Sequence, residues 1–332
     1  MRRVEFAPLA RSVSALGFGC ASLGSRVDAS RGNEALARAY DAGVSWFDVA
    51  PSYGDGRAEF LLGEFLAGKR SKVSVCTKVG ILPSPVQFAL RTVRPIVRHA
   101  IGLLPELRKH AVKLRPAAQR VGLTGSFVES SVVESLRRLR TDHVEVLALH
   151  EPQLADVQRE DVLQALDNVV RKGYACTISL ASDLNVALAA VTLSERVGII
   201  QVANGPFEPN VALAKRKLPA GRSVAFVTHS VYGHDGTLDA LTAMIANQSD
   251  TRSLMYSSGY CGAPREAAAA FLLDFALASN REGVILLSMY EQRHFSFDIG
   301  RLTVSPPPEI VLYLASRLMT SHACPDWLEE MA

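Results

Sequence analysis

The sequence predicts an α/β fold, a (β/α)8 TIM barrel with a long helical insertion after the third strand, and three observations support this prediction. Short apolar runs alternate with amphipathic segments of helical periodicity, which is typical of βα units around a parallel sheet. There are eight such runs, the strand number of a TIM barrel. Polar residues close several runs, at the strand ends where barrel enzymes carry their active sites. We therefore expect one domain over residues 1–332.

The expected strands are short and apolar throughout, as strands that are buried on both faces of a parallel sheet usually are. They span 16–20, 44–49, 73–78, 144–149, 175–180, 199–202, 223–228 and 284–287. The amphipathic helical segments are expected at 33–42, 58–67, 127–139, 157–172, 184–197 and 265–279, with a terminal helix at 309–319. A doubly wound open sheet is the alternative. It is disfavoured because residues 17–22 do not match the G-x-G-x-x-G motif that opens the first helix of that fold.

The insertion is expected at about 81–125, on the C-terminal face of the barrel, and is far longer than a usual βα loop. Within it, residues 89–121 carry eight Lys and Arg and a single acid, Glu106. Three interpretations are open: a helical excursion with a solvated basic face, a cap that brings positive charge to an anionic substrate, and a membrane-surface segment. Pro95 and Pro105 interrupt the apolar stripe and disfavour the last.

Composition excludes several classes of function. A formal net charge of +3 is too small to indicate a nucleic-acid partner, which usually requires a clustered basic face. No run approaches the ~18 apolar residues of a membrane span, and Asp274 breaks the most apolar stretch, Ala267–Leu277. The first residues lack the apolar core of a signal peptide. We therefore expect a cytoplasmic protein without nucleic-acid or membrane partners.

Cysteine usage agrees with a reducing compartment. The chain has five cysteines, an odd number, and no CxxC pair. We expect them to be reduced thiols in the core, without a disulfide or a metal site. They are Cys20, Cys76, Cys176, Cys261 and Cys324.

Four residues of unlike chemistry, Asp48, Tyr53, Lys78 and His150, end or closely follow the second, third and fourth expected strands. Asp48 and Lys78 are expected to form a buried ion pair, since adjacent parallel strands bring their carboxyl ends to one rim. A neighbouring ammonium lowers the pKa of a phenol, so Tyr53 could transfer a proton near neutrality. His150 could orient a carbonyl oxygen by hydrogen bonding. The missing hydride donor points to a nicotinamide cofactor.

These residues, together with the first-strand segment Leu16–Cys20, resemble the aldo-keto reductase superfamily over nearly the whole chain. The resemblance implies that Tyr53 is the general acid/base, that Lys78 and Asp48 tune it, and that His150 positions the carbonyl. It also implies a small hairpin at residues 4–15 that closes the bottom of the barrel. The Asp48–Tyr53 segment is similar to the branch of bacterial sugar and pyridoxal dehydrogenases.

The resemblance also implies a cofactor site, with departures from the family pattern. Ser182 stands where the family has an asparagine that holds the nicotinamide carboxamide, and Gln201 matches a glutamine that contacts the same group, although it could instead cap a strand. His229 and Ser230 fall in the segment that embraces the pyrophosphate. Ser288 and Arg293 match residues that grip the adenosine 2′-phosphate, but Leu287 replaces the usual lysine. The implied cofactor is NADP(H), with NAD(H) possible; a solvated Arg293 is the alternative.

Three functions remain open from the sequence. The favoured one is an NAD(P)H-dependent oxidoreductase that interconverts a small aldehyde or ketone and an alcohol. The second is a barrel that binds the cofactor as a regulatory or scaffold subunit without catalysis. The third is an isomerase or lyase that uses Lys78 as a Schiff base. Substrate, reaction direction and oligomeric state are not fixed by the sequence.

Overall fold

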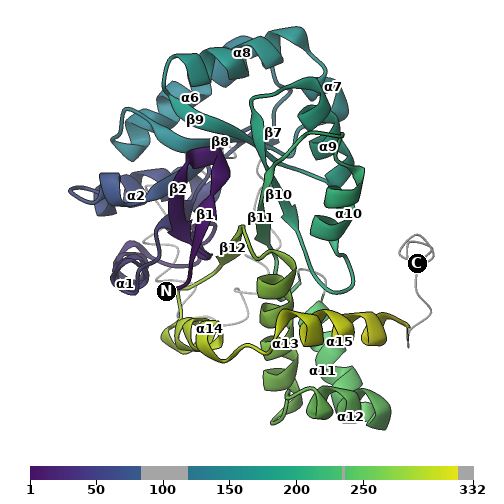
Figure 1. The fold of residues 1–332 in the computed structure, drawn as a ribbon. Helices are drawn as coiled ribbons and strands as arrows, with labels where there is room; N and C mark the ends of the chain where they lie inside the picture. The colour runs from purple at the N-terminus through teal and green to yellow at the C-terminus, as the bar shows by residue number, and fades with distance from the viewer. Residues whose placement is uncertain (84–118, 234–235, 321–332) are drawn as a thin grey trace.

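Eight parallel strands form a closed barrel in the computed structural model, which describes residues 1–83, 119–233 and 236–320 (Figure 1). Each expected strand is present, and the order around the barrel follows the chain. The strands are β3 (Leu16–Gly19), β4 (Trp46–Asp48), β5 (Ser74–Val79), β8 (Val144–His150), β9 (Ala175–Ala181), β10 (Val197–Ala203), β11 (Ala225–His229) and β12 (Val284–Leu287). The predicted TIM barrel is therefore confirmed.

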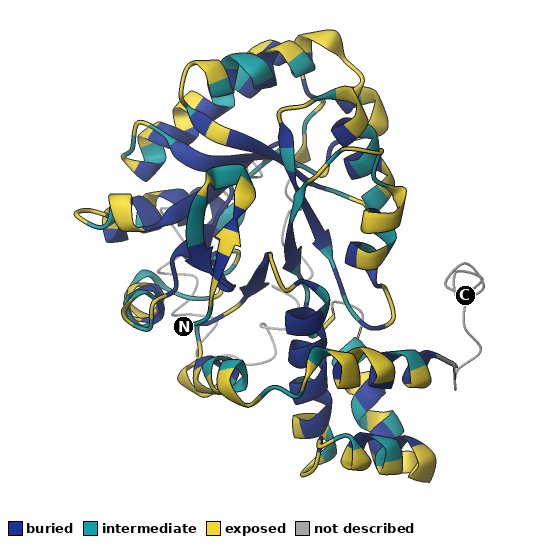
Figure 2. Ribbon diagram, viewed as in Figure 1, coloured by how far each residue is buried: buried dark blue, intermediate teal, exposed yellow. Residues whose placement is uncertain are grey.

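Within the described residues, a helix follows each barrel strand and covers the outside of the barrel (Figure 1). These helices are α1 (Ala29–Asp41), α2 (Ala58–Phe65), α6 (Gly125–Leu139), α8 (Glu160–Arg171), α9 (Leu184–Leu193), α10 (Asn210–Lys217), α13 (Pro264–Ser279) and α14 (Gln292–Val304). The strands are buried on both faces (Figure 2): one set of side chains fills the barrel interior and the alternate set packs under the helices.

One predicted helix is wrong in detail. The segment 157–172 is not continuous, because a short helix α7 (Leu154–Val157) ends before α8 begins. Gln153 and Asp156 form a capping box that fixes the start of α7. The expected terminal helix is present as α15 (Pro308–Thr320). Helices α10, α11 (Thr237–Asn247), α12 (Ser249–Ser257) and α14 were not among the expected helical segments.

Strands β1 (Arg3–Phe6) and β2 (Arg11–Ser14) form the predicted antiparallel hairpin. Phe6 is buried and meets the fully buried Trp46 edge-to-face, with ring centroids 5.1 Å apart. Because Trp46 points into the barrel, this contact plugs the barrel end opposite the carboxyl ends of the strands. At the other end, β6 (Ile81–Leu82) and β7 (Gln119–Arg120) pair antiparallel. The predicted helical insertion and most of its basic segment lie between them, outside the described residues.

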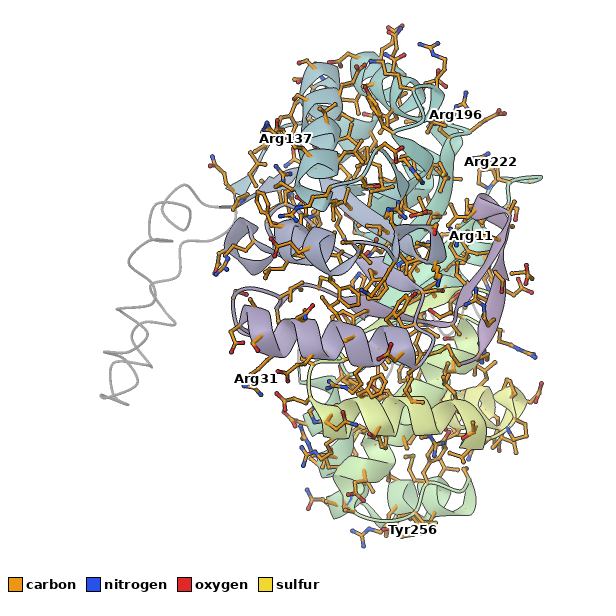
Figure 3. All side chains as sticks on the ribbon, turned by 90° about the vertical axis from the view of Figure 1, so that its left-hand side faces the viewer. Arg11, Arg31, Arg137, Arg196, Arg222 and Tyr256 are labelled. Carbon is orange, nitrogen blue, oxygen red and sulfur yellow. The ribbon has the colours of Figure 1, made fainter. Side chains whose placement is uncertain are left out.

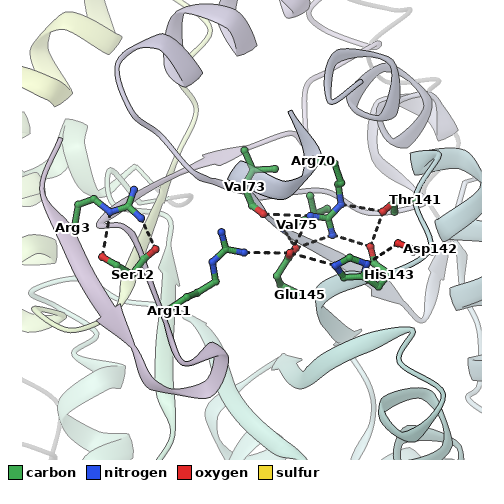
Figure 4. Close-up of polar contacts among 10 residues, drawn as sticks. All are labelled: Arg3, Arg11, Ser12, Arg70, Val73, Val75, Thr141, Asp142, His143 and Glu145. Atoms are coloured by element: carbon green, nitrogen blue, oxygen red, sulfur yellow. Dashed lines mark hydrogen bonds and ion pairs between the residues drawn. The ribbon is translucent and has the colours of Figure 1, made fainter. Parts of the chain in front are cut away.

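The buried Glu145 is the centre of a network of hydrogen bonds and ion pairs at the hairpin end of the barrel (Figure 4). Glu145 on β8 accepts two hydrogen bonds from the Arg70 guanidinium, at 3.0 and 2.9 Å, and one from the backbone N–H of Val75 at 2.7 Å. Arg11 on β2 adds a longer ion pair, 3.5 Å from the same carboxylate. A fork-to-fork arginine pair is strong and directional. Glu145 therefore ties the hairpin and the segment before β5 to the fourth barrel strand.

A second apolar cluster lies beside the barrel, among α11, α12, α13 and α15 (Figures 1 and 2). Helix α13 is buried along most of its length because it packs on the barrel and on this cluster. Asp274, which breaks the apolar run in the sequence, is fully buried here. It pairs with Arg301 and accepts a hydrogen bond from Tyr260 at 3.0 Å. None of the described helices is both long and apolar enough to cross a membrane.

The cysteine prediction was only partly right. Cys20 and Cys76 are free thiols in the core, but Cys176 and Cys261 are free and exposed. Cys176 lies at the start of β9 and Cys261 between α12 and α13, where neighbouring elements leave them uncovered. Cys324 lies outside the described residues.

Basic side chains are spread over separate elements, as the labelled arginines in Figure 3 illustrate. Each of these arginines binds acidic or carbonyl oxygens of the chain. Arg11, Arg31, Arg137 and Arg196 pair with Glu145, Glu291, Glu134 and Asp167, and Arg222 donates to backbone carbonyls. The guanidinium groups of these arginines therefore bind acidic side chains or backbone carbonyls of the same chain.

We expect Arg70→Ala to lower the free energy of unfolding by about 3–5 kcal/mol, because it leaves Glu145 buried without its main partner. Chemical denaturation followed by circular dichroism measures the change. Arg11→Ala is the matched control: its contact is longer and its side chain more exposed, so the loss should stay below about 1 kcal/mol. Equal losses in the two variants would contradict this account of Glu145.

Candidate active site

A cavity of about 1360 Å³ opens at the carboxyl ends of the barrel strands. Its wall includes all four residues of the predicted catalytic set, Asp48, Tyr53, Lys78 and His150. The loops after β3, β4, β5 and β8 form one half of the wall, and those after β9, β10, β11 and β12 form the other. The structure thus brings the four residues of the predicted catalytic set together in the half of the cavity wall that the β3, β4, β5 and β8 loops form.

An ion pair between Lys78 and Asp48 forms the floor of this half. Lys78 Nζ contacts Asp48 Oδ1, and both side chains are almost fully buried. The two residues come from the adjacent strands β4 and β5, which pair in parallel register. Burial alone would lower the pKa of Lys78, but Asp48, helped by Tyr53 and Cys76, raises it above its ordinary value. Lys78 therefore stays an ammonium, which disfavours the Schiff-base alternative, since that reaction needs a neutral amine.

A sharp turn over Tyr53–Gly56 places Tyr53 above the ion pair. Lys78 Nζ lies 5.2 Å from the centroid of the Tyr53 ring. Gly54 has φ +61°, and a Cβ there would lie 1.8 Å from the carbonyl oxygen of Leu23. The turn is therefore pressed against the loop after β3, and only glycine fits at this position. This packing holds in place the turn that carries Tyr53.

The pKa of Tyr53 differs from the sequence prediction. Burial raises the pKa of Tyr53 to about 12, and the charge of Lys78 offsets only part of the rise. The predicted influence of Lys78 is present, but the net shift is upward, because the phenol is removed from water. In the free chain Tyr53 keeps its proton at neutral pH, which is the state needed to donate to a carbonyl oxygen.

His150 faces Tyr53 across the cavity. Their rings meet edge-to-face with centroids 5.8 Å apart. Gly80 packs against the backbone carbonyl of His150, which holds the ends of β5 and β8 close together. Burial, followed by the charge of Lys78, lowers the pKa of His150 to about 3. His150 is therefore a neutral imidazole at physiological pH, able to donate one hydrogen bond without carrying charge.

Gln201 on β10 is buried beside the ion pair. Its Nε2 donates a 3.0 Å hydrogen bond to Asp48 Oδ2, the carboxylate oxygen that Lys78 does not contact. Its Oε1 is buried and has no hydrogen-bond partner among the described residues. Gln201 thus holds Asp48 with one end of the amide and presents an acceptor with the other.

Four further residues predicted from the sequence also line the cavity. Ser182 follows β9 and donates to the carbonyl of Asp183 at 3.0 Å. His229 and Ser230 follow β11, with His229 Nδ1 2.8 Å from Ser230 Oγ. Ser288 follows β12 and is exposed at the rim. These residues lie along the β9–β12 side of the wall, which borders His150 where β9 pairs with β8.

Arg293 is the exception among the predicted residues. It lies in the first turn of α14, is exposed, and is not part of the cavity wall. Its guanidinium lies 3.3 Å from His294 Nε2. The structure therefore leaves Arg293 close in sequence to the rim residue Ser288 but outside the cavity itself.

Sequence reasoning missed several charged residues of the cavity wall, of which three lie on the β3 and β8 side. Arg26 lies in the loop after β3, and Glu151 directly follows His150. Arg120, counted in the sequence only as part of the basic insertion, pairs with Glu151 at 2.8 Å. Their positions immediately after barrel strands, or beside the insertion, were the signal that could have identified them.

The family model that matches this chain is that of the aldo/keto reductase family, over residues 15–205. This stretch is more than half of the chain and contains all four residues of the predicted catalytic set, as well as Ser182 and Gln201. The chain belongs to the aldo/keto reductase family. The matched stretch ends before His229, Ser230, Ser288 and Arg293.

Characterised relatives align with only part of the chain. D-threo-aldose 1-dehydrogenase of a Pseudomonas species is 30% identical over 200 residues, which cover 58% of this chain and 57% of that enzyme. Pyridoxal 4-dehydrogenase of Microbacterium luteolum is 46% identical over 77 residues, 21% of this chain and 22% of that enzyme. The chain therefore spans well under two thirds of the length of these relatives in the alignments.

Solved structures share the fold over nearly the full chain. An aldo-keto reductase from Bacillus halodurans in its holo form has a TM-score of 0.69 at 17% identity, with 96% of each chain covered. An aldo-keto reductase from Klebsiella pneumoniae, solved in complex with NADPH, has a TM-score of 0.65 at 17% identity, with 98% of this chain and 96% of that chain covered. At this identity the likeness concerns the fold alone.

We expect His150 to remain neutral at all pH values above about 4, in contrast to an ordinary histidine of pKa 6.5. In the unfolded chain the imidazole of His150 binds a proton below pH 6.5, whereas in the folded chain it stays neutral until about pH 3. His150 therefore lowers the free energy of unfolding as the pH falls from 6.5 towards 3. The slope is on the order of 1.4 kcal/mol per pH unit.

NMR titration of histidine-labelled protein, assigned with His150→Gln, measures the pKa. Denaturation of both proteins between pH 7 and pH 4.5 measures the stability. His150→Gln should lose less stability than the parent over this interval. A His150 resonance that titrates near pH 6.5 would contradict the described environment.

Proposed function

We propose that this chain is an NADP(H)-dependent oxidoreductase that interconverts an aldehyde or ketone and an alcohol, with Tyr53 as the general acid/base. The observation that carries the proposal is the buried Lys78–Asp48 ion pair beneath Tyr53, with neutral His150 opposite. The phenol can donate a proton to a carbonyl oxygen, and the imidazole can donate a hydrogen bond to the same oxygen. The ammonium can stabilise the phenolate that remains.

The residues of the other half of the cavity fit a nicotinamide cofactor. Gln201 Oε1 is a buried acceptor without a partner among the described residues, which suits an amide N–H donor. Ser182 adds a hydroxyl that can donate or accept beside it. His229, Ser230 and Ser288 extend the polar wall towards β12, which supports a role for them in holding the phosphate groups. When bound, the cofactor supplies or accepts the hydride that no side chain can provide.

Tyr53 and its neighbours handle the proton. In the reductive direction Tyr53, protonated at neutral pH, donates to the carbonyl oxygen as that oxygen gains negative charge. Lys78 stabilises the phenolate that remains, and Asp48 keeps Lys78 charged and in place. His150 donates a hydrogen bond to the same oxygen and orients the carbonyl. In the oxidative direction Tyr53 must first lose its proton, so oxidation should be favoured by alkaline pH.

The kind of substrate is suggested by relatives. D-threo-aldose 1-dehydrogenase and pyridoxal 4-dehydrogenase are both named for oxidation of a hydroxyl or aldehyde group. A small, hydroxylated substrate fits the polar wall of the cavity. We therefore favour a substrate of this kind for the present chain, in either direction.

A second candidate function is a cofactor-binding regulatory subunit without catalysis. A probable voltage-gated potassium channel subunit beta of Arabidopsis thaliana is 30% identical over 170 residues, covering 49% of this chain and 41% of that protein. Ser182, in place of the family's amide side chain, also weakens the expected hold on the nicotinamide. The two candidates differ in one respect: a regulatory barrel binds NADPH without turning over any carbonyl compound.

We expect Tyr53→Phe to lower kcat for carbonyl reduction by roughly 100-fold or more, because it removes the proton donor but keeps the ring. Oxidation of NADPH at 340 nm, measured on a panel of aldehydes, gives kcat. Binding of NADPH, followed by quenching of the buried Trp46, should be unchanged and serves as the control. Full activity in Tyr53→Phe would overturn the role of this residue. Binding without turnover in the parent protein would favour the regulatory candidate.

We expect Arg293→Ala to weaken NADPH binding by roughly 10- to 100-fold and to leave NADH binding nearly unchanged, if Arg293 binds the 2′-phosphate with charge-assisted bonds. Fluorescence titration with each cofactor measures the two constants. Arg281→Ala, another exposed arginine away from the cavity, is the control. An equal effect on both cofactors, or none, would show that Arg293 does not select NADP(H).

A further inference from the structure

Arg26 differs from the arginines that pair with acids elsewhere on the surface. It lies in the loop between β3 and α1 and forms part of the cavity wall, with its side chain exposed. No hydrogen bond or ion pair joins it to another described residue, whereas Arg31, five positions later on α1, pairs with Glu291 at 3.0 Å. Arg26 therefore presents a positive charge to the cavity that its described neighbours leave unpaired.

The loop that carries Arg26 is well ordered by its own contacts. The backbone N–H groups of Leu23, Ser25 and Val27 donate to carbonyls of Cys20 and Ser22 at 3.0–3.2 Å. Leu23 is fully buried and anchors the loop in the core. Its carbonyl is pressed against Gly54, directly after Tyr53. The loop thus holds Arg26 on the same side of the cavity as the predicted proton donor.

The other charges in this half of the cavity largely cancel. Lys78 is neutralised by Asp48, and Arg120 by Glu151. Neutral His150 adds no charge. Arg26 therefore leaves one unit of positive charge on the loop after β3, a strand that lies between β4, which precedes Tyr53, and β12, which precedes Ser288. A guanidinium matches a carboxylate in shape and charge and can bind it through two hydrogen bonds.

We propose that Arg26 is a specificity residue that binds a carboxylate on the substrate, so that this chain prefers monoanionic carbonyl or alcohol compounds over neutral ones of equal size. This inference rests on the proposed oxidoreductase function and adds the chemical class of the substrate. One uncompensated charge favours a monoanion. A phosphate monoester, close to a dianion at neutral pH, would bring more charge than Arg26 offsets.

The test compares 4-formylbenzoate with 4-formylbenzamide, which match in size and differ in charge. The parent protein should show a kcat/KM roughly 10- to 100-fold higher for the benzoate, as expected for a charge-assisted arginine contact. Arg26→Gln should bring the ratio close to one, mainly through KM, and Arg26→Lys should restore part of it. Arg31→Gln, whose arginine is outside the cavity wall, should leave the ratio unchanged.

Glu151→Gln provides a variant of opposite sign. Glu151 pairs with Arg120, so without this acid the positive charge of Arg120 is no longer neutralised at the same rim. The ratio of kcat/KM for the benzoate to kcat/KM for the benzamide should therefore rise by a few-fold. A ratio near one in the parent, or a ratio that Arg26→Gln does not change, would overturn the inference. So would a stronger preference for a phosphorylated benzaldehyde than for the benzoate.

Binding separates failure of this inference from failure of the proposed function. Calorimetric titration with 4-(hydroxymethyl)benzoate and its amide, in the presence of NADP⁺, needs no turnover. Preferential binding of the benzoate that is lost in Arg26→Gln, without reduction of any aldehyde, would support the anion site and overturn the oxidoreductase. Turnover of both aldehydes with equal binding of both alcohols would support the oxidoreductase and overturn the anion site.

Discussion

The structure of the candidate site depends on one buried ion pair, Lys78 with Asp48. Removing two charges from water is costly, and their attraction compensates only when the remaining hydrogen-bonding groups are also satisfied. Here Asp48 accepts from Gln201 with its second oxygen, and Lys78 lies 3.4 Å from the carbonyl of Val49. An apolar pair would stabilise the barrel at least as well, so we interpret the charges as serving Tyr53 rather than the fold.

The closed barrel explains why these residues meet although they are far apart in the sequence. Asp48, Lys78 and His150 end three consecutive strands around the barrel, and Gln201 reaches Asp48 from β10 across its interior. The far end is closed by the hairpin and by the network around Glu145. One end of the barrel is thus built for stability, and the other is left open and polar.

Sequence patterns predicted the strands, and the meeting of Asp48, Tyr53, Lys78 and His150 at one cavity, because both follow from local rules. A buried parallel strand is a continuous apolar run, and a polar residue at its carboxyl end stands out against that run. The helices α10, α11, α12 and α14 were missed because each buries only two of its residues, which leaves a weak apolar pattern in the sequence.

Properties that depend on three-dimensional surroundings were harder to predict. The upward shift in the pKa of Tyr53 comes from burial by several loops, which outweighs the neighbouring Lys78. The exposure of Cys176 depends on which neighbours leave the start of β9 uncovered. Arg26 is part of the cavity wall because the loop after β3 packs on the turn that follows Tyr53, a contact between segments that are distant in the sequence.

The central claim is that the half of the cavity around Tyr53 passes a proton to a carbonyl oxygen while a cofactor in the other half provides the hydride. The most direct measurement is reduction of an aldehyde with NADPH deuterated at C4, followed by mass spectrometry of the alcohol. The account predicts one deuterium on the carbinol carbon with the parent protein and almost no alcohol with Tyr53→Phe. Tight NADPH binding without labelled alcohol from any aldehyde would contradict it.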